Sequence, residues 1–358
     1  MATINRALVI APNWIGDALM AQPLFKLLKA LYPRLIIDAV AARWVAPVLE
    51  RMPEIEEVYT TDFIRQKLQL WRRWQTAQTL REMKYDAAYI LPNSAKSALI
   101  PWFAGIGLRI GYHGEYRYGL LNVRHINPHK KERPPMVRHY AALAYAPGAP
   151  MPDRLPKPYL QIASSEQARI LTRFSLETQA PLIVFCPGAE YGPAKRWPAE
   201  HFATLAQFIA QAFPYTYIVA LGASKDAPLA QAIADRAPHV RNLCGHTTLD
   251  EACALIASAS AVISNDSGLM HIAAATRRPL LALYGSSDPR HTPPLSKTAR
   301  VQWLQLECSP CFARECPLGH LKCLRELKPE QVFESLRDML RAVSSDHLLR
   351  ERSEALHC

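Results

Sequence analysis

The stretch ALVIAPNWIGDALMAQPLFKLLKAL, residues 7–31, sets the pattern for the whole chain. Its first five residues are apolar and end at Pro12, which predicts a strand buried on both faces of a parallel sheet. From Asp17 to Leu31 apolar residues recur at helical spacing, and Pro23 lies inside this pattern, where a kink is expected. A buried strand followed directly by such a helix is the repeating unit of an α/β fold.

The same alternation of strands and helices continues in both halves of the chain. A proline-rich segment, 145–160, is expected to link two domains. We predict doubly wound α/β domains at 1–150 and 151–343, facing each other across a cleft, with a polar tail at 344–358. The last helix is expected from Pro329 to about Val343. Further strands are expected at 35–40, 86–91, 182–186, 216–221, 240–243, 261–264 and 280–284.

The composition is that of a packed protein with an uneven charge. Hydrophobic residues make up 49% and charged residues 20% of the 358 positions, which excludes wholesale disorder. No apolar stretch reaches the ~18 residues that span a bilayer, and no secretory signal pattern is present, so we expect a cytoplasmic protein. Residues 1–150 hold 20 Lys and Arg against 11 Asp and Glu. This excess predicts an anionic partner: nucleic acid, a phospholipid surface or a phosphorylated substrate.

The first motif that could carry chemistry is APNWIGDALM, residues 11–20. Asp17 stands where the first strand gives way to the first helix. It fits either an N-cap or a general base at the carboxyl end of the strand. The single Gly16 does not make the G-x-G-x-x-G pattern, which argues against dinucleotide binding and hence against a nicotinamide-dependent dehydrogenase.

Two motifs in the second half predict an anion site. In CPGAEYGPAKRWP, residues 186–198, small residues and the cations Lys195 and Arg196 follow a strand, as in phosphate-binding loops. In SNDSGLMHIAAA, residues 264–275, Asp266, Ser267 and Gly268 open a helix whose first N–H groups can bind an anion. Asp266 fits the N-cap there, and His271 lies one turn further on.

Two other groups of residues allow alternative interpretations. Cys308, Cys311, Cys316 and Cys323 have the spacing C-x2-C-x4-C-x6-C, and they either bind zinc or remain free thiols. The basic segment 65–84 includes Arg72 and Arg73 between two tryptophans. It forms either a helix on an anionic membrane surface or a core-packing helix with a solvated face. A second basic stretch, 109–138, is expected to be a loop, with its densest charge at 129–133.

The motifs together resemble the ADP-heptose:lipopolysaccharide heptosyltransferases, glycosyltransferase family 9, with the heptosyltransferase II group as the nearest branch. The resemblance runs from about Ala7 to Val343 and rests on the three motifs above together with YILPNSAKSALIPWFAGI (89–106) and YRYGLLN (116–122). It implies a GT-B fold, with the acceptor on the first domain and ADP-heptose on the second. It implies inverting transfer of L-glycero-D-manno-heptose to the first heptose of the lipopolysaccharide inner core, heptosyl-Kdo2-lipid A.

The resemblance also implies roles for individual residues. Asp17 resembles the proposed catalytic base. Apart from the resemblance, the basic segment that contains Arg72 and Arg73 places these two residues on the acceptor or membrane side. No cofactor, no catalytic metal and no nucleic-acid partner are implied. The enzyme is expected on the cytoplasmic face of the inner membrane, on an anionic lipid surface. The residues expected to bind the donor are Gly188, Ala189, Lys195, Asp266, Ser267, Gly268 and His271.

Two alternatives remain beside this prediction. Heptosyltransferases I and III use the same donor class with other inner-core acceptors. A non-catalytic protein would bind ADP-heptose or a membrane without transferring the sugar. The motifs define the donor better than the acceptor.

Overall fold

The computed structural model describes residues 4–64, 67–129 and 134–355, with side chains described as far as residue 342. The chain divides into two compact units, Met1–Gln161 and Ile162–Cys358, each with its own sheet. Two units agree with the prediction, but the boundary lies beyond residue 150. The proline-rich segment belongs to the first unit, because the Tyr159 N–H donates to Gln22 Oε1 at 2.7 Å.

The first unit is a six-stranded parallel sheet in the order β3-β2-β1-β4-β5-β6. The central strands β1, β2 and β4 match the predicted apolar runs. Three outer strands escaped the prediction because they are only partly buried, so no continuous apolar run marks them. Two of them, β5 and β6, overlap the basic stretch 109–138, so the expectation of a loop there is wrong. The strands are β1 Arg6–Ile10, β2 Ile36–Ala42, β3 Val58–Thr61, β4 Ala87–Ile90, β5 Leu108–Tyr112 and β6 Val123–His125.

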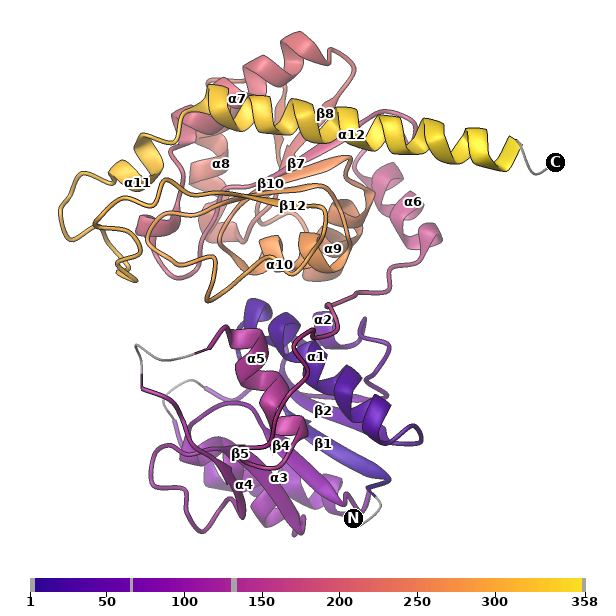
Figure 1. Ribbon diagram of the computed structural model, residues 1–358, viewed down its shortest axis with the longest axis vertical. Helices are drawn as coiled ribbons and strands as arrows, with labels where there is room; N and C mark the ends of the chain where they lie inside the picture. The colour runs from indigo at the N-terminus through magenta and orange to yellow at the C-terminus, as the bar shows by residue number, and fades with distance from the viewer. Residues whose placement is uncertain (1–3, 65–66, 130–133, 356–358) are drawn as a thin grey trace. The chain divides into compact units, whose positions relative to one another are not determined.

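Helices α1, α2 and α5 pack together in the first unit, and α3 packs on α4 (Figure 1). Helix α1 is continuous through Pro23 and buries Leu19, Leu24 and Leu28, as its periodicity predicts. The basic residues 130–133 lie outside the described part of the chain. The helices are α1 Ile15–Leu31, α2 Ala46–Leu49, α3 Leu70–Arg81, α4 Ala95–Phe103 and α5 Met136–Ala141, followed by the 3₁₀ turn η2 Ala142–Ala144.

The second unit repeats this architecture with the strand order β12-β11-β10-β7-β8-β9, again all parallel. All of its predicted strands are present, and only the half-exposed edge strand β12 was missed. Figure 1 shows the sheet between α7 and α8 on one face and α9 and α10 on the other. The strands are β7 Leu182–Cys186, β8 Tyr217–Ala220, β9 Val240–Asn242, β10 Ala261–Asn265, β11 Leu280–Leu283 and β12 Ala299–Gln302.

The last helix, α12, continues to Ala355, beyond the predicted end at Val343. Its first turns pack on α7 and β11. Within the described residues, no helix is both long and apolar enough to cross a bilayer. The helices are α6 Ser164–Arg173, α7 Ala199–Ala212, α8 Ala227–Ala234, α9 Leu249–Ser258, α10 Gly268–Ala275, α11 Lys322–Arg325 and α12 Pro329–Ala355, with the 3₁₀ turns η3 Pro193–Lys195 and η4 Ser224–Asp226.

Both sheets have the strand order 3-2-1-4-5-6 when each unit is counted from its own first strand. In this topology the chain crosses to opposite sides after strands 1 and 4, so the loops that follow them diverge and leave room for a ligand. Asp17 follows β1, the loop 187–198 follows β7, and Asp266 follows β10. The fold therefore brings the predicted site residues to the ligand-binding edge of each sheet.

Candidate active site

In the first unit, Asp17 lies in the first turn of α1 and is held by a tyrosine from α5. Helix α1 begins at Ile15, so Asp17 is inside the helix and the N-cap interpretation is wrong. Tyr140 donates its hydroxyl hydrogen bond to Asp17 Oδ1 at 3.1 Å. Burial and the charge of Asp17 raise the pKa of Tyr140 well above its ordinary value, so this hydroxyl stays protonated. The carboxylate is thus oriented by a permanent donor.

The position of Tyr140 is fixed by its neighbours in the same unit. The ring of His139 stacks on that of Tyr112 with centroids 3.7 Å apart, and the Tyr112 hydroxyl donates to the His139 carbonyl at 2.6 Å. Tyr140 lies 123 residues from Asp17, and no local motif connects the two. Sequence reasoning had no signal by which to find it.

In the second unit, Lys195 and Asp266 form an ion pair between the loops that follow β7 and β10. Lys195 Nζ lies 2.5 Å from Asp266 Oδ2, and both side chains are largely buried. The two loops meet because β7 and β10 are neighbouring parallel strands whose carboxyl ends share one edge. The structure therefore brings together two residues that were predicted from separate motifs.

The start of α10 departs from the prediction in one respect. Ser267, not Asp266, is the N-cap: its hydroxyl accepts the N–H of Met270 at 3.5 Å, and the helix begins at Gly268. Asp266 is engaged by Lys195 instead. The free N–H groups of the first helical turn and the Lys195 ammonium then lie at the same edge, which is the arrangement that favours a bound anion.

The loop after β7 is held in place by Asn265, which was not among the predicted site residues. The buried Asn265 side chain donates to the Pro187 carbonyl at 2.6 Å and accepts the Trp197 N–H at 3.1 Å. A Cβ at Gly188 would lie 2.4 Å from Asp226 Oδ2, so a side chain there would displace the Asp226 carboxylate. Gly188 and the buried Ala189 thus let the backbone pass close to the sheet edge. Asn265 stood within the quoted motif, and its place at a strand end was the available signal.

Arg73 is a correction to the prediction for the basic helix. Its side chain is 5% exposed, its Nε donates to the Leu68 carbonyl at 2.8 Å, and its guanidinium lies 4.2 Å from the Phe63 ring centroid. Arg73 is therefore committed to the interior of the first unit and cannot face a membrane or an acceptor. Arg72, one position earlier on α3, is exposed.

The family model of glycosyltransferase family 9 (heptosyltransferase) matches residues 73–322. This chain belongs to that family. It is 44% identical to lipopolysaccharide heptosyltransferase 2 of Escherichia coli K12 over 94% of this chain and 98% of the relative. It is 42% identical to lipooligosaccharide heptosyltransferase 2 of Haemophilus influenzae Rd over 93% of this chain and 99% of the relative.

Among solved structures, the chain is similar to that of Escherichia coli ADP-heptose lps heptosyltransferase II. The TM-score is 0.84 at 42% identity, with 95% of this chain and 99% of that chain covered. The predicted resemblance, the GT-B fold class and the identification as a glycosyltransferase are thereby confirmed. Membership of this enzyme family excludes the two alternatives of a nicotinamide-dependent dehydrogenase and a non-catalytic binding protein.

His271 lies in this site as a neutral, buried side chain. Burial is the main reason that the pKa of His271 falls to about 4, and the charge of Lys195 lowers it further, against the opposing charge of Asp266. At neutral pH its ring adds no charge next to the ion pair. If His271 contacts the donor as predicted, it does so as a neutral hydrogen-bonding group.

The depressed pKa of His271 predicts a pH dependence of stability. The unfolded chain binds a proton at His271 below about pH 6.5, whereas the folded one binds it only near pH 4. The free energy of unfolding is therefore not reduced by His271 above pH 6.5. It falls as the pH drops toward 4, with a slope of up to about 1.4 kcal/mol per pH unit. His271→Gln should lose unfolding free energy less steeply than wild type over this range in urea titrations. Parallel slopes for the two proteins would contradict the assignment.

Proposed function

We propose that this enzyme transfers L-glycero-D-manno-heptose from ADP-heptose to the first heptose of the lipopolysaccharide inner core, heptosyl-Kdo2-lipid A, with inversion. The carrying observation is the Lys195–Asp266 pair beside the start of α10, an arrangement suited to a diphosphate. The type 2 names of the relatives above 40% identity support this acceptor over those of types I and III.

On the acceptor side, Asp17 acts as the general base. One carboxylate oxygen accepts the Tyr140 hydroxyl, so the carboxylate keeps one orientation. Asp17 takes the proton of the acceptor hydroxyl as that oxygen forms a bond to the anomeric carbon of the donor heptose. The bond from this carbon to the diphosphate breaks, and ADP leaves with the electron pair.

On the donor side, negative charge grows on the diphosphate as this bond breaks. Lys195 and the first N–H groups of α10 are fixed in advance to stabilise that charge. Asp266 neutralises Lys195 before the donor binds and holds its ammonium in place. Gly188 and Ala189 contribute backbone that can approach the donor closely.

Transfer assays with ADP-heptose and defined acceptors test both the acceptor and the base. Wild type should elongate an acceptor that ends in one heptose and not an acceptor that lacks heptose.

Asp17→Asn should lower turnover by ~10²–10⁴-fold, the usual loss for a general base, with ADP affinity within a few-fold of wild type. Tyr140→Phe should raise the pH of the acidic limb of the turnover profile, because a donor to the carboxylate is lost.

The matched control is Asp62→Asn, which removes a carboxylate of the same unit that is exposed and paired with Arg43. This variant should retain wild-type turnover. Full activity in a folded Asp17→Asn protein would remove Asp17 from the mechanism.

Lys195→Ala should weaken ADP-heptose binding and lower turnover further than the binding loss explains. The ammonium interacts most strongly with the charge that develops in the transition state, so kcat should fall as well as KM rise. Lys225→Ala is the control, because Lys225 pairs with Glu190 at the surface of the same unit. Equal kinetics for Lys195→Ala and Lys225→Ala would exclude the role given to Lys195.

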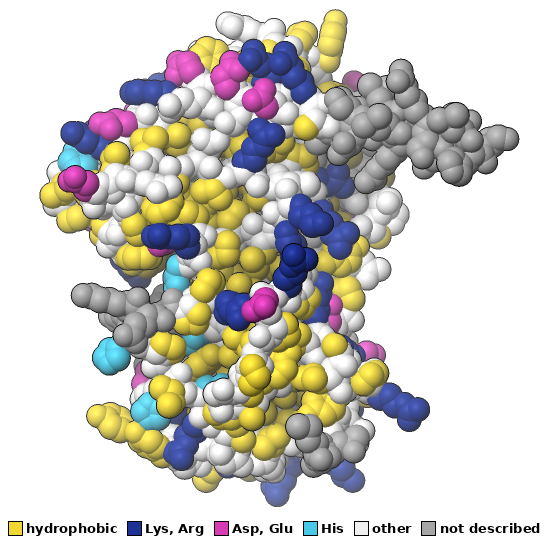
Figure 2. All heavy atoms as spheres, in the orientation of Figure 1, with side chains coloured by type: hydrophobic (Ala, Val, Ile, Leu, Met, Phe, Trp, Pro, Cys, Tyr) yellow, Lys and Arg dark blue, Asp and Glu magenta, His cyan; other side chains and the backbone are white. Residues whose placement is uncertain are grey.

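We further propose that the first unit docks on the anionic cytoplasmic face of the inner membrane through α3 and its surroundings. Trp71 and Trp74 stack with ring centroids 4.7 Å apart and are both exposed, beside the exposed Arg72. Hydrophobic side chains with Lys and Arg among them cover much of the visible face of this unit in the lower part of Figure 2. The exposed apolar residues around α3 and α4 are Ile64, Leu68, Leu70, Trp71, Trp74 and Trp102.

Sedimentation with anionic vesicles tests this docking surface. Arg72→Glu changes two charges at about 1 kcal/mol each, so binding at low salt should fall about 30-fold, and less at high salt. A Trp71→Ser/Trp74→Ser double variant should lose binding at both salt concentrations, because it removes interfacial aromatic anchors. Tyr215→Ser, which removes an aromatic residue exposed on the second unit, is the control. Undiminished vesicle binding by the folded α3 variants would refute the docking surface.

A further inference from the structure

The segment 303–321, between β12 and α11, contains no helix or strand. It nevertheless follows one defined course and exposes Phe312 and Leu318 to solvent. Leu304, Leu306 and Leu321 pack against the core of the unit at the two ends of this loop. Between them, over residues 307–320, Ser309 alone is buried, so the middle of this long loop needs another constraint to stay ordered. Three of the four clustered cysteines lie on this loop, and the fourth, Cys323, lies on α11 immediately after it.

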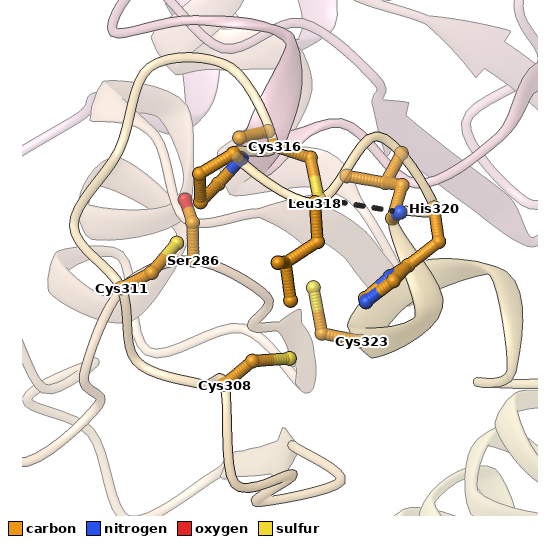
Figure 3. Close-up of a pocket in the computed structure, with 10 residues that line it drawn as sticks. Ser286, Cys308, Cys311, Cys316, Leu318, His320 and Cys323 are labelled. Atoms are coloured by element: carbon orange, nitrogen blue, oxygen red, sulfur yellow. Dashed lines mark hydrogen bonds between the residues drawn. The ribbon is translucent and has the colours of Figure 1, made fainter.

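The four cysteines line one small pocket, together with His320, Leu318 and Ser286 (Figure 3). Figure 3 shows Cys308 and Cys323 on one side and Cys316 on the opposite side, with Leu318 reaching between them. Cys323 is close enough to the other three for their charges to act on its thiol. All four are free cysteines. Residues separated by up to 15 positions thus line one pocket.

The turn after Cys316 is shaped around its sulfur. Cys316 Sγ accepts the Leu321 N–H at 3.4 Å, and N–H groups of residues 318–320 also interact with it. Gly319 has a φ of +68°, which allows the chain to turn back over the sulfur. Backbone N–H groups aimed at a sulfur stabilise the thiolate, the form of cysteine that binds metals. The His320 ring is already occupied, since its Nδ1 accepts the Lys322 N–H at 3.0 Å.

We propose that Cys308, Cys311, Cys316 and Cys323 bind one thiophilic divalent ion, Zn²⁺ or Fe²⁺, through four thiolates. Four sulfurs are the tetrahedral ligand set that these ions prefer. Within the described residues, no three side chains of ligand type already stand at binding separation. Binding therefore requires the sulfurs to turn into the pocket and Leu318 to withdraw. Each ligating thiol releases its proton to solvent, and no oxidation or reduction is involved.

The ion would order the loop that supports the donor site of the same unit. The Ala194 N–H donates to the Arg314 carbonyl at 3.0 Å, and the Tyr191 hydroxyl donates to the Phe312 carbonyl at 2.8 Å. A Cβ at Gly192 would lie 2.4 Å from the Arg314 oxygen, so the two backbones are in direct contact. The loop 303–321 thus packs directly against the segment that ends in Lys195. The ion is a positioning element, separate from the chemistry of transfer.

Metal analysis of the full chain tests the proposal without relying on activity. Protein purified without chelator or metal-affinity resin should contain close to one equivalent of zinc or iron by elemental mass spectrometry, which also identifies the ion. Co²⁺ added to the metal-stripped chain should give intense thiolate-to-cobalt charge-transfer absorption with the d–d bands of a tetrahedral site. Cys316→Ser should weaken Co²⁺ binding by at least about 100-fold, more than the ~10–100-fold typical of residues outside the ligand shell.

The control is Cys358→Ser, which removes a cysteine outside the cluster and should leave the metal content and the cobalt spectrum unchanged. Removal of the ion from wild type should also weaken ADP binding while Asp17→Asn leaves ADP binding intact, so the two proposals fail separately. A wild-type chain that contains no metal and gives no cobalt charge-transfer band would overturn the site. So would a purified chain whose four cysteines are joined in disulfides.

Discussion

The proposed donor site depends on the two hydrogen bonds made by the buried Asn265 side chain. Asn265 ends β10, and it binds the first residue of the loop after β7, Pro187, and nearly its last, Trp197. An amide can do this because it donates from one end and accepts at the other. Both partners are backbone groups that would otherwise be buried without a partner, which is costly. One side chain therefore holds the loop that contains Lys195 against the end of β10, which Asp266 follows.

By holding the two loops together, these hydrogen bonds keep Lys195 and Asp266 paired in a largely buried environment. A buried cation or carboxylate alone would be strongly unfavourable, and a fixed pair still loses hydration. The neutral state of His271 keeps a third charge out of the same volume. The ion pair is thus neutral without a ligand, and the N–H groups of α10 add positive potential that Asp266 does not cancel. This potential favours the diphosphate of the proposed donor. Pre-organisation of this kind serves a charge that appears only during reaction.

Much of this fold could be predicted from sequence because parallel strands buried on both faces leave continuous apolar runs. β1, β7 and β10 were recognisable on that ground, and their order placed the site at two switch points. The edge strands β3 and β12 were not recognisable, since all of their side chains are partly or fully exposed and no buried apolar run marks them. The domain boundary was misplaced because proline content predicts irregular backbone and says nothing about which unit that backbone packs against.

The candidate site was predictable as far as its residues lie in local motifs that follow a strand. Asp17, Lys195 and Asp266 met that condition, while Tyr140 reached Asp17 through packing of α5 on α1, which leaves no mark near either residue. The prediction that Arg73 faces the membrane or acceptor was wrong for a related reason. Helical spacing assigns relative faces, but Trp71 and Trp74 are exposed on α3 while Arg73, one of the two cations between them, turns inward over Phe63. A hydrophobic pattern indicates the buried face only when apolar residues prefer the core, and on α3 the most apolar side chains are among the exposed ones. That inversion is what an apolar environment outside the protein would select, and so the error in placing Arg73 strengthens the case that Trp71 and Trp74 face a membrane.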